Sequence, residues 1–210
     1  LRMFLPSDGP DFSEDMAKSA VEAYAYFESN LGENPFHELD IIGNGGNMEY
    51  PNVIEVSNDS QSFEHTLVHE IAHQWFYYLV SNDPYENAWL DESLTEFSTG
   101  LFLSNYYGDE DGGFQTAQAY KASTTPKPYA DLALDEFDTA AYYATIYGEV
   151  PLLMKGFFDQ QGGNEAALEF LAAYYEEFQF RRVTKQQFRD FFEGYFEGDQ
   201  QEFLNSWLQT

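Results

Sequence analysis

The residues with the clearest potential for chemistry are two histidines and a glutamate that form the pattern H-E-x-x-H. His69 and His73 lie four positions apart, and Glu70 directly follows the first histidine. On a helix, which advances ~1.5 Å per residue with ~3.6 residues per turn, positions four apart lie above one another on one face. Two imidazoles placed in this way can bind one Zn²⁺ at about 2.0–2.1 Å, and the neighbouring glutamate can reach a water on the metal.

A third zinc ligand is expected on the segment that follows. A catalytic zinc usually takes three protein ligands and one water, so the two histidines leave the site incomplete. Glu92 lies nineteen positions after His73, on the next predicted helix. We therefore predict one Zn²⁺ per chain, bound by His69, His73 and Glu92. With Glu70 as the base that activates a water, the chemistry is that of a zinc hydrolase.

His65 lies on the same predicted helix face but is not expected to bind this metal. It is eight residues from His73, or ~12 Å along the helix axis, and one zinc at ~2 Å from each ligand cannot span that distance. We expect it to be structural or to contact a ligand. Histidines on an apolar helical face can also be ordinary core residues, but the turn and the acid-bearing helix that follow favour the metal.

The predicted ligands require two helices that fold back on each other. The spacing of apolar residues predicts a first helix that begins at Ser60 or Ser62 and runs to about Val80. A second helix is predicted from Asn87 to Tyr107, with a glycine directly after it as a stop signal. The turn between them would bring the third ligand opposite the two histidines.

The rest of the chain divides into a β-rich front and a helical back. Strands are expected at residues 1–6, 39–42 and 53–56, and helices at 13–31, 114–122, 147–161 and 166–178. Two more helices are predicted to begin with capping boxes, one of Thr184 with Gln187 and one of Asp199 with Glu202. Pro151 would lie in the first turn of the helix that starts near Tyr147, where a proline is tolerated. The predicted fold class is α+β: one domain of residues 1–210, with a β-rich lobe at about 1–58 and a mostly helical lobe at about 60–210.

The glycine-rich segment G-N-G-G-N at residues 43–47 is not a phosphate-binding loop. No strand–turn–helix context surrounds these glycines. Glycines can instead let the backbone approach a ligand closely, as the edge strand beside a cleft would.

The composition indicates a globular chain with a strongly acidic surface. Of 210 residues 43% are hydrophobic, and no apolar run reaches the length of a membrane span, so we expect no membrane insertion by this segment. Thirty-seven acids against nine bases give a net charge of −28, which argues against nucleic acid or anionic membranes as partners. A solvated surface of the kind suited to high salt explains this charge; attraction of cationic peptides is the alternative. Without Cys, disulfides and thiol catalysis are excluded.

The chain begins L-R-M-F-L-P, without a signal peptide and without Met. We expect it to be a piece of a longer chain, with other domains of that chain as partners. The compartment stays open, with an extracytoplasmic or cell-surface location favoured.

Three segments resemble a known group of enzymes. They are residues 69–76 (H-E-x-x-H-Q-W-F), residues 89–92 (W-L-D-E) and residues 46–50 (G-N-M-E-Y), and the similarity continues to the ending F-L-N-S-W-L. Together they resemble the gluzincin zinc peptidases of the aminopeptidase N family, whose exopeptidase motif has an asparagine where Tyr50 stands here. The resemblance implies a thermolysin-like zincin catalytic domain, without the family's preceding β-domain or following helical domain.

The resemblance also implies roles for residues. His69, His73 and Glu92 would bind zinc and Glu70 would be the general base. Glu49, in its motif with Gly46 and Met48, would hold the α-ammonium of a peptide with a free N-terminus. An exposed carboxylate at a strand edge is the alternative for Glu49.

Two further residues complete the predicted site. The family places a tyrosine near the metal, and Tyr147 aligns with it, although Glu149 and Val150 break the family's pattern. Tyr142 or Tyr143 could be mistaken for this residue, and core packing is the alternative role. Glu96, one turn beyond the third ligand, could accept a hydrogen bond from a ligating histidine, or it could be a solvated acid.

The function implied is a zinc-dependent aminopeptidase that acts on peptides through a metal-activated water. Two alternatives remain open. One is a peptide-binding or scaffolding domain without catalysis, and the other is a zinc endopeptidase in which Glu49 anchors nothing.

Overall fold

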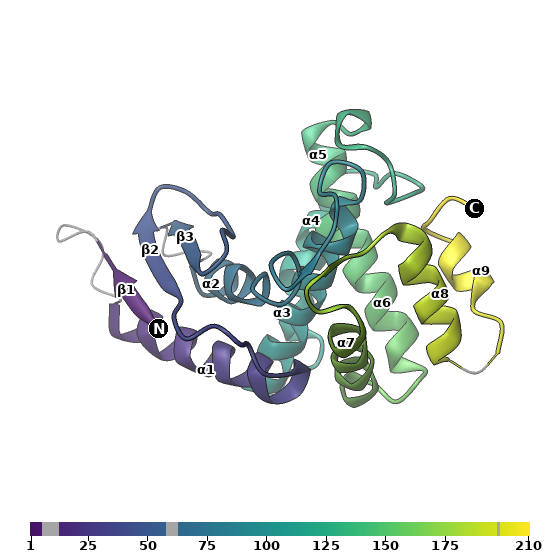
Figure 1. The fold of residues 1–210 in the computed structure, drawn as a ribbon. Helices are drawn as coiled ribbons and strands as arrows, with labels where there is room; N and C mark the ends of the chain where they lie inside the picture. Colours follow the sequence, from purple (N-terminus) through teal and green to yellow (C-terminus); the bar gives the residue numbers. More distant parts are fainter. Residues whose placement is uncertain (6–12, 58–62, 197) are drawn as a thin grey trace.

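A parallel sheet forms one end of the molecule and helices build the rest, as the computed structural model of the chain shows (Figure 1). The structure describes residues 1–5, 13–57, 63–196 and 198–210. The described strands of this sheet follow the order β1 (Arg2–Phe4), β2 (Asp40–Asn44) and β3 (Val53–Ser57), with Ile41 opposite both Met3 and Ile54. All three strands were predicted.

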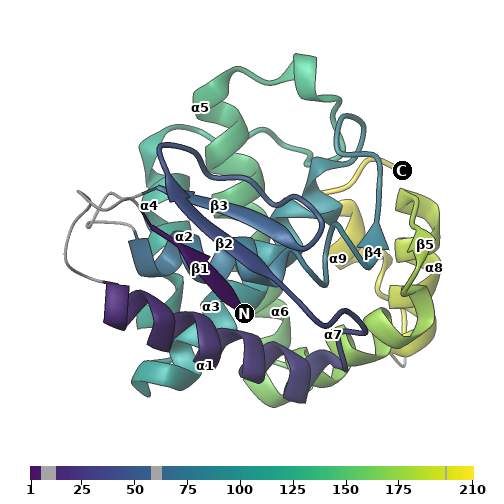
Figure 2. The same cartoon turned by 60° about the vertical axis from the view of Figure 1, so that its left-hand side comes forward.

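Helices α1 (Ser13–Leu31) and α2 (Phe63–Ala72) pack against each other beside the sheet (Figure 2). The buried side of α1 carries Met16, Ala20, Ala23, Phe27 and Leu31 at helical spacing, and Gly32 ends the helix with a φ of 135° that few other residues adopt. The Gly32 carbonyl accepts a hydrogen bond from Trp75 Nε1 over 2.9 Å, which ties the end of α1 to the chain beyond α2.

Helix α2 ends at Ala72, so the prediction that it continues to about Val80 is wrong. The chain reverses at Tyr77, which has a φ of 134°, and Val80 N–H donates back to the Trp75 carbonyl over 2.9 Å. Residues Val80–Ser81 then form β4, which pairs with β5 (Arg181–Arg182). The residues predicted to form the last turns of this helix thus form a reversed segment that pairs with β5, about a hundred residues further along the chain. The predicted starts at Ser60 or Ser62 lie outside the described residues.

Helix α3 (Glu92–Tyr107) runs through the centre of the molecule. It follows the short turn η1 (Ala88–Leu90), and Asp91 Oδ1 accepts a hydrogen bond from Glu92 N at its start. Gly108, with a φ of 66°, ends it as predicted. The described side chains from Ser93 to Ser104 are buried all round, as expected for a helix with protein on every side.

The prediction that a helix starts near Tyr147 is wrong, because the helix begins earlier. The segments α5 (Thr139–Tyr142), η4 (Tyr143–Glu149) and α6 (Val150–Asp159) follow one another without a break in helical backbone. The middle segment is π-helical: Val150 N–H donates to the Thr145 carbonyl, five residues back. This wider turn lets Pro151 lie inside the helical run.

Six further described elements complete the helical part of the molecule, and they include each helix predicted there. They are η2 (Gly112–Phe114), α4 (Gln115–Ser123), η3 (Leu134–Glu136), α7 (Asn164–Phe178), α8 (Lys185–Tyr195) and α9 (Gln201–Asn205). The capping box of Thr184 with Gln187 is confirmed at the start of α8. Asp199 Oδ1 accepts from Gln201 N instead of forming the predicted box with Glu202.

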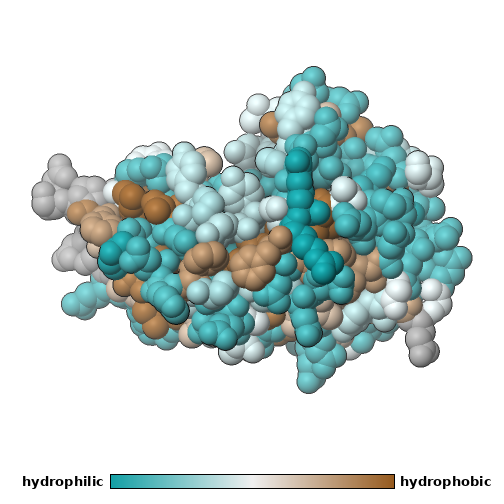
Figure 3. Space-filling view, viewed as in Figure 1, coloured by the Kyte–Doolittle hydropathy of each residue, from teal (hydrophilic) through white to brown (hydrophobic). Residues whose placement is uncertain are grey.

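The described chain is mostly helical with little sheet, in keeping with the predicted α+β class. Hydrophilic side chains cover most of the face drawn in Figure 3. Among the described residues, no helix combines the length and the apolar composition that crossing a membrane requires.

Candidate active site

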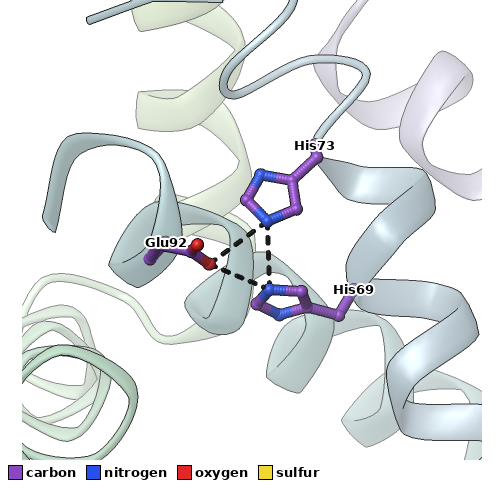
Figure 4. Close-up of side chains that lie close together, drawn as sticks. All are labelled: His69, His73 and Glu92. Atoms are coloured by element: carbon purple, nitrogen blue, oxygen red, sulfur yellow. Dashed lines mark hydrogen bonds and ion pairs between the residues drawn. The ribbon is translucent and has the colours of Figure 1, made fainter. Parts of the chain in front are cut away.

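Three donor atoms from α2, the residue after it and α3 converge on one point (Figure 4). His69 Nε2 and His73 Nε2 are 3.1 Å apart, and each lies 3.2 Å from Glu92 Oε2. Donors at about 2.0–2.1 Å from a tetrahedral zinc stand ~3.3–3.4 Å from one another. The triangle is therefore close in size to the one that three ligands of a tetrahedral zinc ion form.

The outer nitrogen of each imidazole also has a partner. His69 Nδ1 lies 3.1 Å from Glu96 Oε2, and His73 Nδ1 lies 3.0 Å from the Phe76 carbonyl. Thr95 Oγ1 is 3.1 Å from the same His73 nitrogen. When an acceptor holds the Nδ1 proton, Nε2 is left with its lone pair free, which is the tautomer that binds a metal. The donor set thus fits Zn²⁺ in chemistry as well as in size.

Glu96 bridges two histidines and is buried (2% exposed). Its Oε2 faces His69, and its Oε1 lies 3.0 Å from His65 Nε2. The rings of His65 and His69 are nearly parallel, at 24°, with centroids 6.2 Å apart. The structure thus places His65 beside the carboxylate that contacts a predicted ligand, and it excludes the alternative of a solvated acid for Glu96.

Opposing influences set the protonation of this cluster. Burial acts to lower the pKa of His69, but hydrogen bonds to Glu92 and Glu96 outweigh it and raise that pKa well above its ordinary value. Burial acts to raise the pKa of Glu92, and the two imidazoles hold it well below its usual range instead. The carboxylates of Glu92 and Glu96 lie against the imidazole rings, and their negative charge favours a cation bound between the rings.

Glu70 lies on α2 beside the triangle and is almost fully buried (5% exposed). Burial raises its pKa to about 7. A general base works best when its pKa is near the operating pH. Its Oε2 atom has no hydrogen-bond partner among the described residues. One carboxylate oxygen of Glu70, one of Glu49 and one ring nitrogen of His73 all lie within 4.8 Å of one another. An unpaired buried carboxylate oxygen is suited to taking a proton from a water or substrate.

Glu49 belongs to a segment that runs antiparallel along the free edge of β3. Met48 and Glu55 exchange backbone hydrogen bonds of 3.1 and 2.8 Å. This pairing brings Met48 and Glu49 to the wall of the cleft at the candidate metal centre. Gly46, which the sequence also predicted to bind substrate, is not among the residues that line the cleft. It lies in the turn before Met48, where its N–H donates to Asn44 Oδ1 over 2.7 Å.

Tyr147 lies on η4 with its ring against His69, the two centroids 5.6 Å apart and the planes at 23°. Burial, and then the charge of Glu92, raise its pKa well above the ordinary value, so the phenol stays protonated. Tyr142 and Tyr143 also line the cleft, but of the three it is Tyr147 whose ring stacks on His69, a predicted metal ligand.

The cleft around the candidate centre has a volume of about 470 Å³. Sequence reasoning missed several residues that line it: Asn47, Thr66, Pro84, Tyr120 and Leu134. Asn47 lies within the predicted motif and Thr66 lies one position after His65, so both could have been inferred from their neighbours. The other three come from separate loops and helices, and no local pattern places them there.

Two imidazoles and a carboxylate around one point, with a buried glutamate beside them and an open cleft, define the gluzincin class of metallopeptidase site. The comparison with known proteins agrees: the model of the Peptidase family M1 domain matches residues 43–207. The chain belongs to this family of zinc metallopeptidases, and the resemblance seen in the sequence is confirmed.

Curated relatives include two named enzymes. The chain is 28% identical over 165 residues to leukotriene A-4 hydrolase of Xenopus laevis, covering 71% of this chain and 27% of the relative. It is 30% identical over 149 residues to aminopeptidase B of Rattus norvegicus, covering 65% and 23%. The chain thus spans about a quarter of the length of the curated relatives it matches.

Solved structures share the fold. The M1 zinc metallopeptidase of Deinococcus radiodurans superposes with a TM-score of 0.72 at 19% identity, over 97% of this chain and 46% of that one. The yeast leukotriene A4 hydrolase in complex with bestatin gives 0.75 at 20% identity, over 97% and 36%. The mostly helical architecture with a small sheet is therefore the fold of M1 peptidases.

Proposed function

We propose that this chain is the thermolysin-like catalytic domain of a zinc-dependent aminopeptidase, with zinc bound by His69, His73 and Glu92. The observation that carries the proposal is the triangle of donor atoms 3.1–3.2 Å apart. Membership of the M1 family supports it, as does the name of one relative, aminopeptidase B.

When bound, zinc supplies a Lewis acid that polarises the scissile carbonyl and makes a water more acidic. Glu70 takes the proton of the attacking water on its unpaired Oε2 and passes it to the leaving amine. The Tyr147 phenol, which stays protonated, donates a hydrogen bond to the developing oxyanion. Each of these groups lines the cleft.

Glu49 binds the α-ammonium of the substrate and so fixes cleavage at the first peptide bond. Its carboxylate lies close to Glu70, which places the amino terminus within reach of the base. Its neighbour Met48 forms part of the same wall. The partner is thus a peptide with a free N-terminus.

Replacement of the base tests the mechanism. Glu70→Gln should retain zinc at one equivalent per chain and lose turnover of aminoacyl substrates by about 10²–10⁴-fold, because only proton transfer is removed. Metal analysis and steady-state hydrolysis check this. Normal turnover by the variant would refute the assignment of the base, and zinc bound by a wild-type protein that never hydrolyses peptides would favour the scaffolding alternative.

A second experiment separates the aminopeptidase from an endopeptidase. The wild-type protein should hydrolyse a free-amine peptide and leave its acetylated twin intact. Glu49→Gln should lower kcat/KM for the free-amine peptide by about 10–100-fold, since hydrogen bonds to charged groups contribute ~1.5–3 kcal/mol. Equal cleavage of both peptides by the wild type would show that Glu49 anchors no ammonium group. Glu55→Gln, on the neighbouring strand and outside the cleft lining, is the matched control.

A further inference from the structure

The π-helical turn that carries Tyr147 is fixed to α3 by one buried hydroxyl. Ser93 Oγ donates a hydrogen bond to the backbone carbonyl of Ile146 over 2.5 Å. Both residues have 0% of their surface exposed. The Ile146 carbonyl and the Tyr147 nitrogen belong to the same peptide plane. The hydroxyl therefore holds the plane from which the Tyr147 side chain starts.

Pro151 explains why this carbonyl needs a side-chain donor. Val150 N–H donates to the Thr145 carbonyl, five residues back. The next bond of that pattern would join residue 151 to Ile146, but a proline has no N–H to give. A buried carbonyl without a donor destabilises the fold, and Ser93 supplies the missing hydrogen bond.

The turn is also held at two other points. The Tyr147 ring stacks on the ring of His69, with centroids 5.6 Å apart and planes at 23°. On the other side Gly148 packs against α4 so closely that an added Cβ would lie 2.5 Å from the Lys121 nitrogen. Ser93 thus holds the backbone of this segment and His69 contacts its ring, while α4 prevents the segment from moving away.

We propose that Ser93 is a positioning residue for Tyr147, whose peptide plane it fixes so that the phenol faces the substrate carbonyl beside the metal ligands. This role rests on the proposed function, in which Tyr147 stabilises the oxyanion. A misplacement of ~1 Å in an active site can cost about 10²-fold in rate. Two other contacts still hold the turn when the Ser93 hydroxyl is lost, so we expect a smaller misplacement of the phenol and a fall in kcat of about tenfold.

The first test compares two buried serines of α3 in the zinc-loaded protein. Ser93→Ala should lower kcat about tenfold, with KM and the zinc dissociation constant each changed by less than about twofold, since it touches neither substrate nor metal. Ser98→Ala is the matched control: Ser98 is 1% exposed, and its Oγ donates to the Leu94 carbonyl within α3 itself. The control should keep its kcat. Equal losses in both variants, or no loss in either, would overturn the proposal.

A double-mutant cycle asks whether Ser93 acts through Tyr147. Tyr147→Phe should lower kcat, and adding Ser93→Ala to it should lower kcat no further, because no hydroxyl is left to position. Multiplied losses in the double variant would show that Ser93 acts elsewhere. If the wild type hydrolyses peptides and Tyr147→Phe is fully active, the aminopeptidase stands and the positioning role falls.

Backbone hydrogen exchange gives a readout that does not depend on hydrolysis. Residues 143–150 should exchange faster in Ser93→Ala than in Ser98→Ala, while the rest of α3 stays protected in both. Unchanged exchange in this segment would overturn the positioning role even in a protein with no peptidase activity. Absence of hydrolysis by the wild type, with faster exchange in Ser93→Ala, would instead count against the proposed function alone.

Discussion

At the scale of single residues, the proposed zinc site depends on side chains that contact the predicted ligands and not the metal itself. Glu96 uses both carboxylate oxygens, one for His69 and one for His65. Its ionised form is maintained in a buried place, because the histidines outweigh burial and lower the pKa of Glu96. A carboxylate so held keeps the ring of His69 in one orientation.

The first prediction concerns the affinity for zinc. Glu96→Ala should weaken zinc binding by about 10–100-fold, as losses around ligating histidines commonly do. His65→Ala should weaken it less, because Glu96 would remain but lose its second anchor. His65→Gln, whose side-chain amide can donate to Glu96, should restore most of the loss. Competition with a chromogenic chelator measures each dissociation constant.

His37→Ala is the control, because His37 is exposed and does not line the cleft. This variant should bind zinc as the wild type does. If His65→Ala and His65→Gln bind zinc as tightly as the wild type, the contact between His65 and Glu96 contributes nothing to the proposed metal site.

At the scale of elements, Glu64 joins three helices near the start of α2. Its Oε1 accepts a hydrogen bond from Ser19 Oγ of α1 over 3.0 Å, and its Oε2 accepts one from the Tyr107 hydroxyl of α3 over 2.5 Å. A carboxylate in the first turn of a helix also interacts favourably with the helix dipole. These contacts fix the ends of the two helices that carry the predicted zinc ligands.

Removing the tyrosine hydroxyl should destabilise the fold in a way that depends on pH. The hydrogen bond to Glu64 is the main cause that raises the pKa of Tyr107 to about 12, above its ordinary value of 10.0. The contribution is therefore fully present below pH ~10 and is lost as the pH rises through ~12. Because Tyr107 is 61% exposed, we expect Tyr107→Phe to cost only about 0.5–1 kcal/mol at pH 8.

Urea unfolding of the wild type and of Tyr107→Phe at pH 8 and pH 11.5 measures this difference. Tyr129→Phe, which removes the hydroxyl of an exposed loop tyrosine, is the control. It shows how alkaline pH changes the stability when a tyrosine hydroxyl elsewhere is lost. A difference that stays constant, or that grows with pH, would contradict the assigned hydrogen bond.

Local spacing explains which parts of the fold and the site the sequence could predict. His69 and His73 face one point because both belong to about one helical turn, and the caps at Thr184 and Gly108 act over a few residues. The end of α2 depended on pairing between Val80 and Arg181, a hundred residues away, so periodicity alone extended that helix too far.

The parts that the sequence did not predict are contacts between distant segments. The π-helical turn accommodates Pro151, and the Ser93 hydroxyl donates to a carbonyl of that turn, but neither residue indicates the other in the sequence. Tyr120 reaches the cleft because α4 packs closely on η4. Such contacts follow from tertiary packing, on which a single sequence carries no local signal.

At the scale of the whole molecule, the acidic surface sets the balance between repulsion and folding. The net charge is −28, from thirty-seven acids and nine bases. Most of these bases already form ion pairs with acids in the described part of the chain: Arg2, Lys121, Lys155, Arg181, Arg182 and Lys185. The surplus carboxylates therefore repel one another with few cations left to offset them, which destabilises the compact state.

Salt should therefore stabilise this protein. The Debye length falls from about 30 Å at 0.01 M to about 3 Å at 1 M, so repulsion between surface carboxylates is largely screened in 1 M NaCl. We expect the free energy of unfolding to rise by at least about 1 kcal/mol, or about 2–4 °C in Tm for a chain of this size. Thermal melts at pH 7 in both salt concentrations measure the change.

The same increase in salt at pH 4 provides the internal control, because many carboxylates are then protonated and there is less repulsion to screen. The gain in Tm should be smaller there than at pH 7. A Tm that falls with salt at pH 7 would mean that the ion pairs, which salt weakens, outweigh the repulsion. An equal gain at both pH values would mean that salt acts through hydrophobic burial and not through charge.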